Sequence, residues 1–132
     1  MSDPITALRV LLVTPDPTLR DLLRDVLGPA TFAEAAEADP ALQELRSGRW
    51  DVVLLDLRLP RTNGLVALKW LRQVRPEVPV VVVTSLPATP YAGAAERAGA
   101  AGFVAREQAR ERVGAVVRAV MARRTREGVP RW

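Results

Sequence analysis

A single carboxylate follows a short run of four apolar residues in this chain. Residues 52–55 are Val-Val-Leu-Leu, and Asp56 comes directly after them. A short apolar run of this kind predicts a strand that is buried on both faces of a parallel sheet. Because open parallel sheets place their chemistry beyond the carboxyl ends of the strands, Asp56 is a candidate nucleophile or metal ligand. Pro60 and Asn63-Gly64 then provide turn residues before the next helical pattern.

The composition limits the chemistry that this carboxylate can join. The 132-residue chain contains no cysteine and no histidine, which excludes disulfides, thiolate ligands and imidazole acid–base catalysis. Chemistry must therefore use carboxylates, hydroxyls, arginines or the one lysine, Lys69. Thr14-Pro15-Asp16-Pro17 stands where a nucleotide-binding enzyme would need a glycine-rich phosphate loop, so that class is disfavoured.

Charge and hydropathy argue against two kinds of partner. Much of the excess positive charge comes from arginines between positions 118 and 131, where cations complement the dipole of a closing helix. These arginines are not interleaved with aromatic residues that could stack on bases, so we expect no direct binding to nucleic acid. No apolar run approaches the roughly 18 residues that span a bilayer, and the start lacks the features of a secretion signal. We expect a cytoplasmic protein that does not bind membranes.

Five apolar segments alternate with five segments of helical periodicity. Asp16-Pro17 and Asp39-Pro40 each have the pattern of a helix N-cap followed by proline. Strands are predicted at 8–14, 31–36, 50–56, 78–84 and 102–105. Helices are predicted at 17–27, 40–47, 65–74 and 90–98, with a closing helix that is marked by Val113 to Val120 and ends near Arg126.

This alternation predicts an α/β fold with a doubly wound, five-stranded parallel sheet and helices on both faces, as in flavodoxin-like proteins. With the strands numbered along the chain, the order 2-1-3-4-5 places the most apolar strands at the centre. The tips of the first and third strands then become neighbours, which brings residues 14–16 close to Asp56. We predict a domain at residues 1–124 and a C-terminal tail at 125–132.

Over essentially its whole length, the chain resembles the receiver domains of bacterial two-component response regulators, including the chemotaxis regulators. The residues that carry the resemblance are Asp56, Leu59-Pro60, Gly64, Thr84 with Ser85, and the run from Gly99 to Phe103. The resemblance implies that Asp56 is the phosphoacceptor of a phosphorelay. It also implies that Thr84 is a switch hydroxyl and Phe103 a switch aromatic.

Two departures from the family's pattern lie at the site itself. The family carries an acidic pair at the tip of the first strand, where this chain has Thr14 and Pro15. The family also carries a lysine, often followed by proline, at the tip of the fifth strand. Here these positions are Arg106 and Glu107.

The missing acidic pair predicts a weakened magnesium site. The family holds Mg²⁺ with that pair and the phosphoacceptor, and magnesium prefers several hard oxygen ligands. Asp56 is the remaining carboxylate, and the backbone carbonyl of Arg58 is a further oxygen. Asp16 is an alternative ligand, although we favour its role as a helix cap. We also predict a direct ion pair between Asp56 and Arg106, whose planar fork would replace part of the charge of Mg²⁺.

Plainer interpretations of the same residues stay open. Asp56 can be a structural carboxylate at a strand end, Thr84 an ordinary strand hydroxyl and Phe103 a core aromatic. Val66 and Trp70 lie four residues apart on the flank of the predicted helix at 65–74, where they either anchor a partner or pack under a neighbouring helix.

Three functional interpretations follow, none of them an enzyme. The first is a receiver module in which Asp56 takes a phosphoryl group from a sensor histidine kinase or phosphotransfer protein. The second is a phosphorylation-independent pseudo-receiver that acts as a protein-interaction adaptor. The third is the N-terminal part of a DNA-binding response regulator, with 123–132 as linker. The resemblance implies that a downstream protein or a second copy contacts the face of the fourth helix, fifth strand and fifth helix.

Overall fold

Strands and helices alternate along the chain in the computed structural model, which describes residues 8–128 and, within that range, the side chains up to Arg124. The elements in chain order are β1 (Arg9–Val13), α1 (Pro17–Leu27), β2 (Thr31–Ala35), α2 (Ala38–Ser47), β3 (Val52–Leu55), α3 (Gly64–Val74), β4 (Val80–Thr84), α4 (Ala88–Arg97), β5 (Gly102–Ala105), the short 3-10 helix η2 (Arg106–Gln108) and α5 (Ala109–Gly128).

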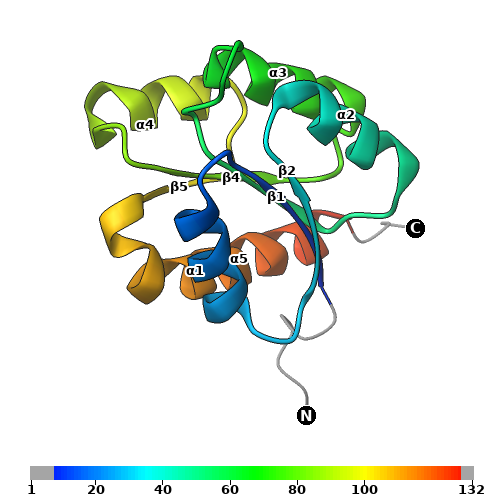
Figure 1. Cartoon of the computed structure of the whole chain (residues 1–132). Coiled ribbons are helices and arrows are strands. Elements are labelled where there is room, and N and C mark those ends of the chain that lie inside the picture. Colours follow the sequence, from blue (N-terminus) through cyan, green and yellow to red (C-terminus); the bar gives the residue numbers. More distant parts are fainter. Residues whose placement is uncertain (1–7, 129–132) are drawn as a thin grey trace.

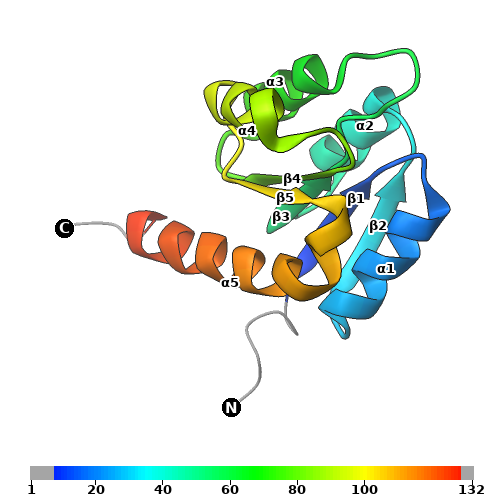
Figure 2. The same ribbon diagram turned by 90° about the vertical axis from the view of Figure 1, so that its left-hand side faces the viewer.

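The strands of this described region form one parallel sheet in the order β2-β1-β3-β4-β5. Helices α1 and α5 cover one face, and α2, α3 and α4 cover the other (Figures 1 and 2). The predicted fold class and strand order are therefore confirmed. Because all strands run in parallel, the loops that follow them meet at one edge of the sheet, which we call the carboxyl edge. The loops that precede the strands meet at the opposite, amino edge.

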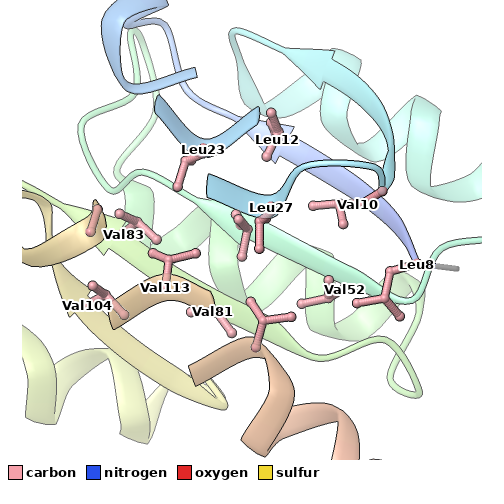
Figure 3. Packing of buried hydrophobic residues seen from close by; sticks show 14 of the residues in the cluster. Leu8, Val10, Leu12, Leu23, Leu27, Val52, Val81, Val83, Val104 and Val113 are labelled. Carbon is pink, nitrogen blue, oxygen red and sulfur yellow. The ribbon is translucent and has the colours of Figure 1, made fainter. Parts of the chain in front are cut away.

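Each face of the sheet has its own hydrophobic core. Val10 and Leu12 pack toward α1 and α5, whereas Leu11 and Val13 pack toward the other layer. Figure 3 shows the first core, in which Leu23 of α1 and Val113 of α5 approach the strands. Burial on both faces explains why the central strands are continuous apolar runs rather than alternating ones.

Several element boundaries differ from the predicted ones. Helix α2 begins at Ala38 with Glu37 as its N-cap residue, so Asp39 lies inside the first turn rather than at the cap. An acidic residue is favourable there because it complements the helix dipole. The backbone of α5 continues to Gly128, and the division of the chain after residue 124 stays a prediction. No helix within residues 8–128 is long and apolar enough to cross a membrane.

The structure decides between the two interpretations of the α3 flank. Val66 and Trp70 are 39% and 40% exposed, so no neighbouring helix of the described region buries them. Their contribution to the core is therefore small, in contrast to Leu68 and Leu71 on the opposite side of the same helix.

Candidate functional site: a carboxylate between two threonine hydroxyls

Asp56 lies at the carboxyl edge, directly after the central strand β3. Its backbone N–H donates to the carbonyl of Val13 at 2.9 Å, which fastens the tip of β3 to the tip of β1. Only 5% of the residue is exposed. A carboxylate buried to this degree needs hydrogen-bond donors around both of its oxygens.

Three donors surround the Asp56 carboxylate. The hydroxyl of Thr84 donates to Oδ1 at 3.1 Å, and the backbone N–H of Arg58 donates to the same oxygen at 2.9 Å. The hydroxyl of Thr14 donates to Oδ2 at 3.0 Å. These hydrogen bonds are assisted by the charge of the carboxylate, and they fix its orientation with neutral groups.

Both threonine hydroxyls also accept a hydrogen bond, so they connect three loops through one carboxylate. Thr14 Oγ1 accepts from the backbone N–H of Asp16 at 3.1 Å, and Thr84 Oγ1 accepts from that of Leu86 at 3.3 Å. Thr14 and Thr84 are 1% and 0% exposed. The sequence analysis noted Thr14 only as a departure from the family's acidic pair and missed its role as a donor to Asp56. The signal was available, because a hydroxyl follows β1 at the strand tip next to β3.

Asp16 lies next to this hydrogen-bond network and has two structural roles. Its Oδ1 accepts from the backbone N–H groups of Thr18 at 2.9 Å and Leu19 at 3.4 Å, which confirms the predicted N-cap of α1. Its Oδ2 pairs with the guanidinium of Arg106, which stands at the start of η2. The hydrogen bond from Arg106 holds the pKa of the Asp16 carboxyl below its ordinary value. The capping N–H groups act in the same direction, against the opposing effect of desolvation.

The predicted ion pair between Asp56 and Arg106 is therefore wrong. Arg106 binds Asp16, and no ion pair between described side chains includes Asp56. The physical reason is competition. The Asp56 oxygens are already satisfied by three donors inside a buried site, where a guanidinium would lose its hydration. Asp16 is 30% exposed at its side chain and offers a free oxygen without that cost.

The donors at this edge do not fit a resident magnesium ion in the observed arrangement. Both oxygens of Asp56 already accept hydrogen bonds, Thr14 is neutral, Pro15 has no side-chain oxygen and Asp16 is engaged by Arg106. The part of the chain that the structure describes holds no group of three or more acidic, histidine or cysteine side chains suited to a metal ion. Mg²⁺ prefers an octahedral set of hard oxygens, and this site presents one hydrogen-bonded carboxylate.

The loop after Asp56 is held by a close backbone approach. A Cβ on Gly64 would lie 2.3 Å from the carbonyl oxygen of Leu57, so only glycine fits at the start of α3. Asn63 caps this helix by accepting from the N–H of Leu65 at 2.8 Å. The loop between Asp56 and α3 is thus held in one conformation. Phe103 lies farther along the sheet on β5, where it is partly buried against the core beneath α2, α3 and α4.

Comparisons with known proteins show which family has this fold and this strand-tip carboxylate. A family model for the response regulator receiver domain matches residues 10–118. The chain therefore belongs to the response regulator receiver domain family, whose members act in two-component signalling.

The particular relatives include several response regulators. Response regulator GacA of Pseudomonas aeruginosa is 32% identical over 101 residues, which cover 76% of this chain and 47% of that protein. The solved structure of a LuxR-family two-component response regulator from Aurantimonas has a TM-score of 0.81 and 28% identity, over 88% of this chain and 86% of that one. A CheY-like receiver domain protein from Methanospirillum hungatei shares the fold, with a TM-score of 0.84, 19% identity, and coverage of 92% and 99%. The chain spans about half the length of the first curated relatives that it matches.

Proposed function

We propose that this chain is a phosphoacceptor module in a two-component phosphorelay and that Asp56 accepts the phosphoryl group with a reduced dependence on Mg²⁺. The observation that carries the proposal is the buried Asp56 carboxylate, held at the carboxyl edge between the hydroxyls of Thr14 and Thr84. Membership of the receiver family supplies the class of reaction, and the donors supply the departure from its usual metal chemistry.

The transfer needs a nucleophile and donors for the phosphoryl oxygens. One oxygen of Asp56 attacks phosphorus, the P–N bond to a phosphohistidine of the donor protein breaks, and the histidine nitrogen leaves with the electron pair. The hydroxyls of Thr14 and Thr84, which now donate to the carboxylate, turn to donate to the phosphoryl oxygens. Movement of Thr84 reports the modification, and Phe103 follows as the switch aromatic.

Arg106 supplies the positive charge that phosphoryl transfer requires. Its guanidinium is linked to the site through Asp16 and the Asp16 N–H, which donates to Thr14. In our proposal Arg106 leaves Asp16 for the phosphoryl group, to which its planar fork binds through two hydrogen bonds. Asp56 retains a weak capacity for Mg²⁺, which Asp16 can join only when it releases Arg106.

Intact-mass spectrometry tests this proposal directly. The chain is incubated with acetyl phosphate, from which acetate leaves as the P–O bond breaks, either with Mg²⁺ or with a chelator. We expect a mass increase of one phosphoryl group in both conditions and none in the Asp56→Asn variant. An adduct on the Asn variant would contradict Asp56 as the acceptor, and no adduct on the natural chain would contradict phosphorylation altogether.

The second candidate is a phosphorylation-independent pseudo-receiver that acts as an adaptor. The Asp16–Arg106 pair favours it, because it keeps the cation away from Asp56 while every polar atom of the site is satisfied. Absence of an adduct under all conditions would select this candidate.

Partners follow from the same family membership. We propose a sensor histidine kinase or phosphotransfer protein as the phosphoryl donor, and a downstream protein or a second copy on the face of α4, β5 and α5. Because the chain spans about half of its relatives, a third candidate is the N-terminal part of a DNA-binding response regulator. The chain itself is proposed to bind neither nucleic acid nor membranes and to catalyse no reaction on another substrate.

A further inference from the structure

A basic pocket lies at the amino edge of the sheet, at the opposite end of β3 from Asp56. Its volume is about 490 Å³, and the ends of α2 and α3, the loop before β3 and Arg124 of α5 line it. Among the described residues that line it, four are arginines and two are carboxylates: Arg46, Arg49, Arg75, Arg124, Asp51 and Glu77. The lining therefore carries an excess of two positive charges.

Two of these arginines have structural roles. Arg75 caps α2 by donating to the carbonyls of Leu45 at 3.1 Å and Arg46 at 3.0 Å, and it lies 3.6 Å from Glu77. Arg124 donates to the carbonyl of Asp51 at 2.7 Å and lies 3.6 Å from its carboxylate. The two carboxylates of the pocket are thus each matched by an arginine.

The other two arginines have no such match. The guanidinium groups of Arg46 and Arg49 are exposed and make no hydrogen bond or ion pair with any residue that the structure describes. Each offers a planar set of donors that suits the oxygens of a phosphate. Their charge is the excess that Asp51 and Glu77 leave uncompensated.

Trp50 forms a rigid part of the pocket wall. The indole of Trp50 donates to the carbonyl of Glu44 at 2.7 Å, and the guanidinium of Arg9 lies 5.1 Å from the ring centroid. Gly48 leaves room for the ring, because a Cβ there would lie 3.0 Å from the indole nitrogen. The fixed wall lowers the entropic cost of binding, and the remaining cost is the ordering of the exposed Arg46 and Arg49 side chains.

We infer that this pocket binds a small anion that carries at least two phosphoryl groups. Arg46 and Arg49 contact the phosphoryl oxygens, and Arg75 and Arg124 hold the wall and add to the positive potential. The volume lies in the range of small-molecule sites, which favours a free polyphosphate compound over a nucleic-acid backbone. The inference does not depend on phosphorylation of Asp56, which lies at the other edge.

Isothermal titration with inorganic pyrophosphate in metal-free buffer of constant ionic strength tests the inference. The test variant is Arg46→Gln/Arg49→Gln, and the matched control is Arg97→Gln/Arg112→Gln, which removes the same charge from exposed arginines of α4 and α5. We expect the affinity to fall roughly tenfold or more in the test variant, because two charge-assisted contacts are lost. The control and the Asp56→Asn variant keep the affinity of the natural chain.

Four results would overturn the inference. They are no binding of pyrophosphate to the natural chain, an equal loss in the control variant, an equal loss in the Asp56→Asn variant, or equally tight binding of inorganic phosphate. Because the guanidinium groups of Arg46 and Arg49 have no partner among the described residues, circular dichroism of the test variant is expected to match that of the natural chain. Their replacement therefore reports on binding rather than on folding.

Discussion

The two edges of the sheet differ in how their charged side chains are compensated. At the carboxyl edge, Asp56 is buried and is balanced by neutral donors, while the nearby cation Arg106 is held by Asp16. At the amino edge, arginines outnumber carboxylates, and the guanidinium groups of Arg46 and Arg49 have no partner among the described residues. One sheet therefore carries a buried carboxylate with hydrogen-bond donors at one edge and exposed guanidinium groups without partners among the described residues at the other. The residues of the loops at each edge determine which kind of site forms there.

The largest expected effect comes from adding one methyl group at each edge. Gly64→Ala places a Cβ against the Leu57 backbone, which cannot move without disturbing the loop after Asp56, and we expect a loss of about 3 kcal/mol or more in the free energy of unfolding. Gly48→Ala meets only the Trp50 side chain, and we expect about 1 kcal/mol or less. Urea unfolding measures both. Equal losses would mean that the carboxyl edge is no more tightly built than the amino edge.

The threonine hydroxyls provide the next test of that difference. Thr14→Val leaves the buried Oδ2 of Asp56 without a donor, and we expect a loss of ~1–3 kcal/mol. Thr84→Val removes one of the two donors to Oδ1, which keeps the N–H of Arg58, and we expect a smaller loss of ~1 kcal/mol. The control at the amino edge is Ser47→Ala, which removes an exposed hydroxyl and is expected to change stability by less than ~0.5 kcal/mol. Valine variants as stable as the natural chain would show that the hydroxyls do not hold the carboxylate.

A smaller effect is expected from the Asp16–Arg106 pair. Asp16→Asn keeps a capping oxygen for α1 but loses the ion pair. The folded-state pKa of Asp16 is lowered, so the stability that its charge contributes is present above pH 3.8 and is lost as the pH falls through the folded-state pKa. The natural chain should therefore be more stable than the variant at neutral pH, and the difference should shrink in acid. Chemical unfolding of both chains across this range measures it, and a difference that does not vary with pH would contradict the assignment.

The smallest effect is expected at the exposed flank of α3. Trp70 is 40% exposed, so Trp70→Ala should change the free energy of unfolding by less than ~0.5 kcal/mol. Trp50→Ala at the amino edge removes a buried ring together with its hydrogen bond to Glu44, and it should cost ~3 kcal/mol or more. Thermal and urea unfolding of the pair of variants sharpens the distinction, and a large loss at Trp70 would place it in the core.

The sequence predicted the fold well because its signals are local and repeated. Apolar runs such as residues 52–55 and the Asp16-Pro17 start of α1 each specify one element, and alternation then leaves few ways to wind a parallel sheet. The predicted strand order also placed Asp56 and residues 14–16 at the same edge of the sheet, as observed. The boundaries of the elements were less certain, as at Asp39, because acidic residues are favoured both at the N-cap and inside the first turn of a helix.

The partners of individual side chains were harder to predict. Sequence reasoning paired Arg106 with Asp56 because both stand at strand tips, but it could not see that Thr14 and Thr84 already satisfy that carboxylate. Nor could it see that Asp16 presents a second oxygen to Arg106 while capping α1. The pocket at the amino edge was missed for a similar reason, because its arginines come from separate elements.

The most direct test of the central claim is the rate at which acetyl phosphate modifies Asp56, measured by intact mass with Mg²⁺ and with a chelator in otherwise identical buffer. In our proposal, Arg106 and the hydroxyls of Thr14 and Thr84 supply much of the stabilisation that a divalent ion provides elsewhere in the family. We therefore expect rates in the two conditions that differ by less than about tenfold, which corresponds to about 1.4 kcal/mol of barrier. Modification that requires Mg²⁺ and stops in the chelator would contradict it.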